Sequence, residues 1–210
     1  MKGPQTKGVL LISIAADILK FVEEGRISRE DLEADLSPDA LKVLDSEISP
    51  ISWYDSDIYP QLARFLMKIE GRKPGEMSYL RERGERAGRR LVESGLYQQF
   101  DYMKRRADEQ RGALIDRKLF EQGLRLINSV AAAFMKGGTW TLEQDPDHDD
   151  RVQFVVTDVA GMSEENAHAT CGILTGITKS GRGGFSWLYE RPAPDRVVYR
   201  MDRDIGKIDD

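Results

Sequence analysis

The fold of this chain is decided by its last third, residues 139–201, which read TWTLEQDPDHDDRVQFVVTDVAGMSEENAHATCGILTGITKSGRGGFSWLYERPAPDRVVYRM. Alternating apolar residues and runs of β-branched and aromatic residues predict four strands, at 139–143, 152–157, 184–190 and 196–201. Between the two pairs, residues 163–179 have the length and composition of a helix, with Ser163 as its N-cap. The last third is therefore predicted to form a ββαββ unit.

The rest of the chain is predicted to be almost wholly helical. Apolar residues recur at helical spacing in the segments 9–24, 28–36, 37–44, 55–69, 77–94 and 118–136. Ser28 and Ser37 are predicted N-caps, because a serine side chain can accept the N–H of an early helical residue. The predicted fold class is α+β. We expect one domain, 1–210, in which the helical N-terminal half, residues 1–137, packs on the small antiparallel sheet of the ββαββ unit, residues 138–203.

Two glycines interrupt the helix predicted at 77–94. Gly84 and Gly88 fall on its inward stripe, together with Leu80 and Leu91. A glycine in a helix interior costs about 1 kcal/mol relative to alanine. The sequence therefore predicts that another helix, or a ligand, approaches this helix closely at the two glycines, and helix packing is the favoured cause.

Composition limits the class of protein. The 210 residues are 40% hydrophobic and 32% charged, as in a globular domain. A formal net charge of −5 argues against nucleic-acid binding, which requires a basic surface. The single cysteine cannot form an internal disulfide, and no apolar run reaches the roughly 18 residues of a membrane span. No signal peptide is evident. The expected location is cytoplasmic.

Two groups of residues are typical of catalytic or metal chemistry but lack complete motifs. Cys171 and His168 lie three residues apart on one helix, and Asp158 precedes them, yet a nucleophile needs both a base in contact and an orienting group. Zinc needs three or four ligands. We therefore expect Cys171 to be a core residue, and we predict no catalytic residue, no metal site and no cofactor. A cysteine-dependent enzyme is the least favoured alternative.

The acidic tip of the first predicted hairpin resembles the start of a calcium loop. Asp145, Asp147 and Asp149 alternate as the first three EF-hand ligands do. The sixth position is Asp150 instead of glycine, and the twelfth is Val156 instead of glutamate. We therefore predict a solvated hairpin tip without calcium.

Aromatic residues mark a second candidate region. Pro50 predicts an extended loop at 48–54, and Trp53, Tyr54 and Tyr59 lie in this loop or at the start of the next helix. Such residues anchor a core by default, and the alternative is that they form the wall of a pocket. The face of the helix at 118–136 contributes Phe120, Leu124 and Ile127.

The order of these elements resembles a known family. The resemblance is carried by Lys7-Gly8-Val9-Leu10, Trp53-Tyr54, the helices at 83–93 and 120–134, and Cys171-Gly-Ile-Leu-Thr-Gly. Together they resemble a family of bacterial proteins of about this length, often paralogous in myxobacteria. That family is similar in layout to haem-NO-binding and 4-vinyl-reductase-type sensor domains. The resemblance covers nearly the whole chain.

The resemblance implies a sensor-like α/β domain with an internal pocket between helices and sheet. The expected ligand-binding residues are Trp53, Tyr54, Tyr59, Phe120, Leu124, Ile127 and Cys171. Haem is not carried over. Haem-binding relatives have a proximal histidine on a helix ahead of the sheet. In this chain, His148 and His168 both lie in the last third of the sequence. Relatives of the vinyl-reductase type can carry clustered cysteines, from which the lone Cys171 departs.

The function predicted from these observations is a non-enzymatic small-molecule-binding or signalling module with an apolar pocket. The alternative is a protein-interaction adaptor that docks through the charged helix face of Arg81, Arg83, Arg86, Arg89 and Arg90. The expected partners are a small apolar ligand or a protein, with a homodimer as the expected assembly and with neither nucleic acid nor a membrane span.

Overall fold

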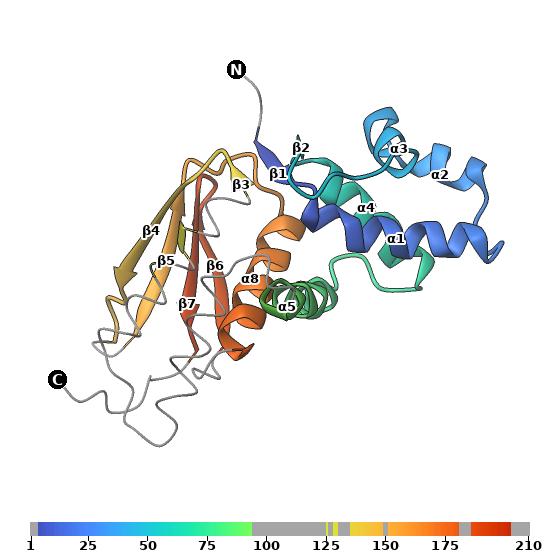
Figure 1. Ribbon diagram of the computed structural model, residues 1–210. Helices are drawn as coiled ribbons and strands as arrows, with labels where there is room; N and C mark the ends of the chain where they lie inside the picture. Colours follow the sequence, from blue (N-terminus) through green and yellow to red (C-terminus); the bar gives the residue numbers. More distant parts are fainter. Residues whose placement is uncertain are drawn as a thin grey trace.

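The computed structural model describes residues 4–93, 125, 128–129, 135–148, 151–180 and 186–202. Figure 1 shows a helical lobe at one side and a four-stranded sheet at the other, with helices α5 and α8 between them. The fold is α+β, and helices pack on an antiparallel sheet as predicted. No helix in the described ranges is both long and apolar enough to cross a membrane.

The helical lobe is built from the N-terminal segment of the chain. Its elements are β1 (Gln5–Lys7), α1 (Val9–Glu23), α2 (Arg29–Asp35), α3 (Pro38–Leu44), β2 (Trp53–Asp55) and α4 (Ile58–Ile69). The Ser28 side chain accepts the N–H of Asp31 in a complete capping box, and Ser37 accepts the N–H of Ala40. The two predicted N-caps are confirmed, because these signals act within a single helical turn.

Helix α5 (Met77–Glu93) leads to the C-terminal unit. This unit contains β3 (Met135–Lys136), β4 (Thr139–Gln144), β5 (Val152–Thr157), α8 (Glu164–Ser180), β6 (Trp187–Ala193) and β7 (Arg196–Met201). The four-stranded sheet has the order β4-β5-β7-β6, and all neighbours are antiparallel. The predicted ββαββ order is confirmed, and the Ser163 side chain accepts the N–H of Asn166 at the start of α8.

Strand β6 runs further than the sequence predicts. The predicted end is residue 190, yet the strand continues through Pro192 to Ala193 with an irregular register against β7. Because β6 lies at the edge of the sheet, it pairs with a strand on one side only, and a proline without an N–H is tolerated there.

A small three-stranded sheet, β2-β1-β3, is absent from the sequence prediction. Lys7 pairs with Trp53, and Thr6 pairs with Met135. The prediction places a loop at 48–54 and continues a helix to 136, and both are wrong at Trp53–Asp55 and Met135–Lys136. Strands of two or three residues are too short to show a period, so only pairing reveals them.

The apolar core has two regions. One fills the helical lobe around Leu11, Ile14, Ile18, Leu62 and Leu66. The other lies between α8 and the sheet, around Phe154, Leu174, Trp187 and Tyr199. Helix α5 contributes to both regions, with Tyr79 and Leu80 in the lobe and Leu91 and Val92 at the sheet. It therefore ties the two halves of the molecule together.

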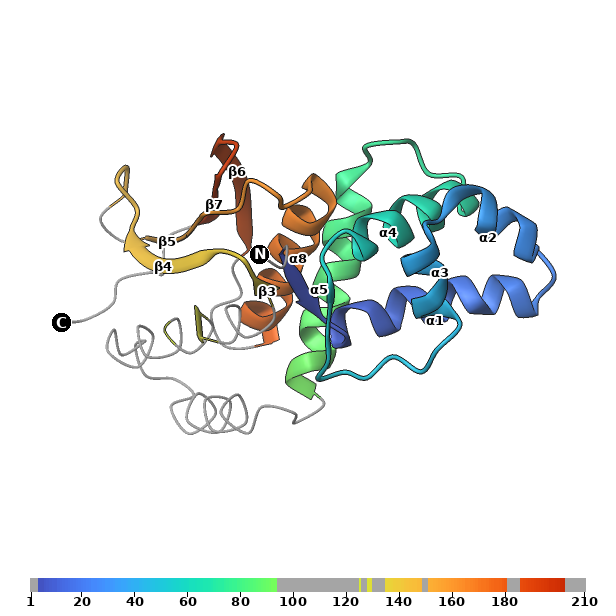
Figure 2. The same cartoon turned by 90° about the horizontal axis from the view of Figure 1, so that it is seen from above.

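Helices α5 and α8 lie side by side, as Figure 2 shows. Their contact is made by Gly84 and Gly88 of α5 and Gly172 and Gly176 of α8, which we call the glycine seam. A Cβ added to any of these glycines would lie 2.1 to 2.3 Å from a backbone oxygen of the facing helix. The close helix packing predicted at Gly84 and Gly88 is confirmed.

Candidate functional site

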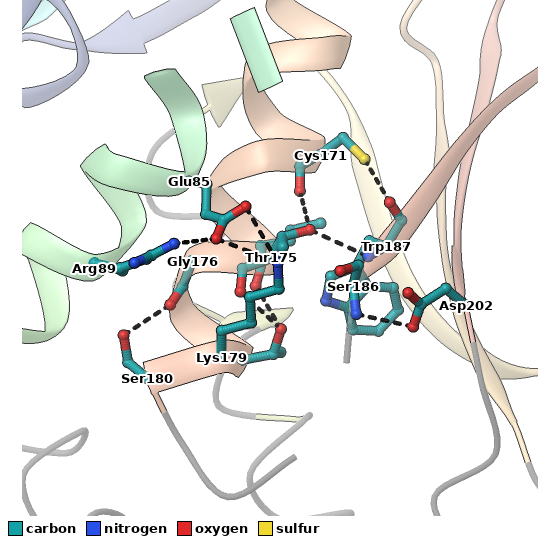
Figure 3. Close-up of polar contacts among 12 residues, drawn as sticks. Glu85, Arg89, Cys171, Thr175, Gly176, Lys179, Ser180, Ser186, Trp187 and Asp202 are labelled. Atoms are coloured by element: carbon teal, nitrogen blue, oxygen red, sulfur yellow. Dashed lines mark hydrogen bonds and ion pairs between the residues drawn. The ribbon is translucent and has the colours of Figure 1, made fainter. Parts of the chain in front are cut away.

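Cys171 lies on the side of α8 that faces the sheet (Figure 3). Its thiol is fully buried and donates to the carbonyl oxygen of Trp187 at 3.0 Å. The Thr175 hydroxyl accepts the N–H of Trp187 at 3.1 Å and donates to the Cys171 carbonyl oxygen at 2.9 Å. These bonds satisfy backbone groups on the outer edge of β6. Burial raises the pKa of the Cys171 thiol to about 11, so it lacks the exposure and low pKa of a nucleophile.

His168 is engaged elsewhere. Its Nδ1 accepts from Arg81 Nε at 3.1 Å, and its ring centroid lies 4.5 Å from that of Tyr189. Burial, followed by the nearby Arg81 charge, lowers the pKa of His168, so the imidazole is neutral at pH 7. Asp158 accepts from Thr139 Oγ1 at 3.1 Å. Within the described ranges, no hydrogen bond joins Cys171, His168 and Asp158, so they form no catalytic constellation.

The acidic tip between β4 and β5 is only partly solvated. Asp145 is buried, and its Oδ1 lies 3.0 Å from Arg200 Nη1, which also lies 3.0 Å from Asp147 Oδ2. The prediction of a solvated tip is therefore wrong for Asp145 and right for the exposed Asp147. Asp149 lies outside the described residues. In the segments of the chain that are described, no group of three or more His, Cys, Asp or Glu residues could hold a metal ion.

Among the described residues, the strongest candidate site is a cavity of about 40 Å³, which we call the Tyr59 cavity. It lies where α1, α4, α5, α8, β1 and β3 meet, at the junction of the helical lobe and the ββαββ unit. Apolar side chains such as Leu10, Ile14 and Ile173 form one side of its wall. Its polar lining residues are Thr6, Ser13, Tyr59, Arg83, Asn166 and Thr170.

Tyr59 is the most unusual of these residues. The residue is only 8% exposed, and burial raises its pKa to about 12. Its hydroxyl has no hydrogen-bond partner among the described residues. The hydroxyl oxygen is not one of the fully buried polar atoms that lack a partner, so it keeps accessible surface at the cavity. An occupant of the cavity can therefore bond this hydroxyl.

Arg83 supplies a buried positive charge at the same cavity. Its side chain is 11% exposed, and Nη2 lies 2.6 Å from Asp17 Oδ2. Weaker bonds of 3.4 Å reach the hydroxyls of Ser13 and Tyr79. Burial disfavours the charged guanidinium, but the bonds and charges of Asp17 and Tyr79 together outweigh it, and the pKa of Arg83 is raised. The guanidinium therefore stays charged.

Asn166 connects this cavity to a smaller one. Its Nδ2 donates to the carbonyl oxygen of Ser56 at 3.0 Å, which holds the buried amide in place. A second cavity of about 20 Å³ shares Asn166 and Met135 with the first. Thr170 Oγ1 also reaches Met135 Sδ, at 3.4 Å. The polar lining thus comes from both halves of the molecule.

Of the residues predicted from the sequence, the structure brings Tyr59 to this cavity. Trp53 lies on β2, half-buried, with Lys7 Nζ and Lys136 Nζ at 4.1 and 4.3 Å from its ring centroid. The Tyr54 hydroxyl accepts the N–H of Ser49 at 3.1 Å.

The remaining predicted residues are not gathered at the cavity. Cys171 faces the sheet, and Phe120, Leu124 and Ile127 lie outside the described residues. Sequence reasoning missed Arg83 and Asn166 as site residues. The only local signal for Arg83 was its position beside Gly84, and Asn166 had none.

Solved structures share this layout. An H-NOX mutant from K. algicida in the unliganded Fe(II) state has a TM-score of 0.53 and 13% identity, covering 93% of this chain and 95% of that chain. An H-NOX protein from S. oneidensis in the Fe(II)NO ligation state has a TM-score of 0.51 and 11% identity, covering 93% and 98%. A Cs H-NOX mutant with 4-cyano-L-phenylalanine has a TM-score of 0.52 and 15% identity, and the match covers 96% of this chain and 99% of that chain.

No protein-family model and no curated protein sequence matches the chain. At such low identities the structural likeness establishes the fold. The layout is related to that of haem-NO-binding sensor domains, as the resemblance implied.

The described histidines, Cys171 and the cavities lined by described residues do not fit haem. Haem iron in proteins is held by histidine, cysteine, methionine or tyrosine. His148 is exposed in the β4–β5 turn, His168 Nδ1 is bonded to Arg81, and Cys171 is a protonated thiol in the core. The two cavities lined by described residues measure about 40 and 20 Å³, against about 300–1,000 Å³ for typical cofactor sites.

Proposed function

We propose that this chain is a non-enzymatic signalling module that responds to a small molecule bound in the Tyr59 cavity. The observation that carries the proposal is Tyr59, a buried residue whose hydroxyl has no described partner and lies at a cavity between the two halves of the fold. The H-NOX-like layout supports the same idea, because one protein with that layout is in an Fe(II)NO ligation state. The lining is mixed polar and apolar, whereas the sequence predicts an apolar pocket.

The arrangement of elements suggests how binding would be transmitted. Helices α5 and α8 are held together by the glycine seam and by Lys179, which donates to Glu85 at 3.3 Å (Figure 3). Helices α1 and α4 contact the cavity from the helical lobe, while α8 and β3 contact it from the other half. Among the positions that the helical lobe can take relative to the ββαββ unit, a bound ligand would favour the one in which it makes the most favourable contacts.

Two alternatives have less support. The environment of Cys171 does not suit a cysteine-dependent enzyme. In an adaptor that docks through the arginine face, three of the five arginines already have internal partners. Arg81 bonds His168, Arg83 bonds Asp17 and Arg89 bonds Glu85. A homodimer, and a wider pocket that includes Phe120, Leu124 and Ile127, stay predictions.

A thermal-shift screen of small polar and small apolar compounds tests the proposal. Ala87 lines the cavity, so Ala87→Leu would fill it, and Ala16→Leu makes the same change at an exposed position of α1. A ligand at 100 times its Kd stabilises the folded state by about 2.7 kcal/mol. We expect hits that stabilise the wild type and Ala16→Leu but not Ala87→Leu. Hits that stabilise Ala87→Leu equally, or a screen without hits, would contradict the proposal.

A further inference from the structure

The geometry points to a ligand class for this cavity: a small planar monovalent oxyanion, of which formate is the simplest example. This inference rests on the proposed function, because it uses the same cavity. It follows from three properties of the Tyr59 cavity, namely its volume, the hydrogen-bond donors that its lining can offer, and the position of Arg83 on its described lining.

The volume limits the ligand to a few atoms. A cavity needs about 10–15 Å³ by this measure to hold one water molecule. The 40 Å³ of the Tyr59 cavity therefore admit about three groups of that size. Formate has that number of heavy atoms. Nucleotides, fatty acids and other drug-sized ligands need cavities of about 300 Å³ or more.

The polar lining can offer several donors to an anion. The Tyr59 hydroxyl and the buried Thr6 hydroxyl have no side-chain hydrogen bond among the described residues. The bonds that Arg83 makes to described residues use Nη1 and Nη2, which leaves its Nε–H for a ligand. Oδ1 of Asn166 is an acceptor, because the side-chain bond of this residue uses Nδ2. Hydroxyls both donate and accept, so the two hydroxyls and the Arg83 Nε–H can together offer three donors to a ligand that only accepts.

The charged side chain on the described lining of the cavity is that of Arg83. Arg83 is 11% exposed, whereas its partner Asp17 is 46% exposed, so water screens the carboxylate far more than the guanidinium. The other carboxylate that acts on Tyr59 is Glu165, which is 15% exposed and paired with the 63% exposed Arg64 at 3.2 Å. Arg83 lines the cavity, whereas Asp17 and Glu165 do not, so an anion in the cavity meets the guanidinium directly and the carboxylates from further away.

The test compares sodium formate with sodium chloride at equal ionic strength. The readouts are the Tm of the protein and the Kd of ¹³C-formate from NMR line broadening. We expect formate, but not chloride or the longer butyrate, to raise Tm saturably. Tyr59→Phe removes one hydrogen bond to a charged ligand and should weaken binding about tenfold. The matched control is Tyr54→Phe, whose hydroxyl bonds Ser49 outside the cavity, and it should bind formate like the wild type.

Three results would overturn the inference: equal effects of formate and chloride, equal loss of binding in the two tyrosine variants, or a high-resolution structure in formate with water alone in the cavity. If, in addition, a neutral compound binds in a manner that depends on Tyr59, the proposed function stands without this ligand class. If formate binds but leaves hydrogen exchange of α1 and α4 unchanged, the ligand class stands and the signalling role fails.

Discussion

The glycine seam and the Tyr59 cavity are adjacent, yet they are built in opposite ways. At the seam, four glycines bring two helix backbones into contact, and there is no room for a methyl group. At the cavity, which Gly84 also lines, larger side chains such as Ala169 and Thr170 keep the elements apart and enclose space. The two halves of the molecule are therefore closely packed where the backbones of α5 and α8 touch, and space is left between them where side chains meet.

The largest expected effect is loss of the seam. A Cβ in Gly172→Ala would lie 2.1 Å from the Arg81 carbonyl oxygen, and backbone cannot yield as a side chain can. We expect the free energy of unfolding to fall by about 3 kcal/mol or more. In Gly71→Ala the same methyl meets open space, and only its φ of +67° costs stability, about 1–2 kcal/mol. Urea denaturation that shows equal losses would refute the difference.

The next effect is a loss of stability at alkaline pH. The pKa of Cys171 is raised from 9.0 to about 11, and that of Tyr59 from 10.0 to about 12. As pH rises through 9 to 12, the unfolded chain therefore releases protons that the folded chain retains, so stability present below pH 9 is lost. Each group should contribute about 2–3 kcal/mol.

Two variants separate these contributions. Cys171→Ala should remove the component of the loss that begins near pH 9, and Tyr59→Phe should reduce the component that begins near pH 10, to which the buried Tyr199 also contributes. The measurement is the free energy of unfolding against pH. If the contribution of Tyr59 is much smaller than that of Cys171, the cavity is hydrated while the core at the sheet is dry, which would sharpen the contrast between the two regions.

The smallest effect concerns the two tyrosine hydroxyls in ligand-free buffer. The Tyr59 hydroxyl has no described partner, so Tyr59→Phe should change stability at neutral pH by less than about 0.5 kcal/mol. Tyr54→Phe removes the bond to the Ser49 N–H and should cost about 1 kcal/mol. A clear loss in Tyr59→Phe would mean that water or another molecule already bonds the hydroxyl.

Much of the fold could be predicted because its signals are local. The strands at Val152–Thr157 and Arg196–Met201 have the predicted bounds, since alternation is visible within six residues. The caps at Ser28, Ser37 and Ser163 act within one turn. The short sheet β2-β1-β3 could not be predicted, because its strands show no period and exist only through pairing.

The candidate site was predictable only to a limited extent. Tyr59 stood out as an aromatic residue at a helix start, and the glycines beside Arg83 indicated a close approach. Nothing in the order of residues connects Arg83 on α5 with Asn166 on α8, and these side chains share a cavity only because the glycine seam brings their helices together.

By itself, the sequence determined the elements: the ββαββ order, the caps, and a helix whose glycines require a close neighbour. Tertiary structure decided which helix that neighbour is, which face of α8 Cys171 occupies, and where space is left over. The physical reason is the distance along the sequence over which each signal acts. Periodicity and capping depend on residues within a turn or a strand, whereas a cavity depends on how well side chains from distant segments fill the volume between them.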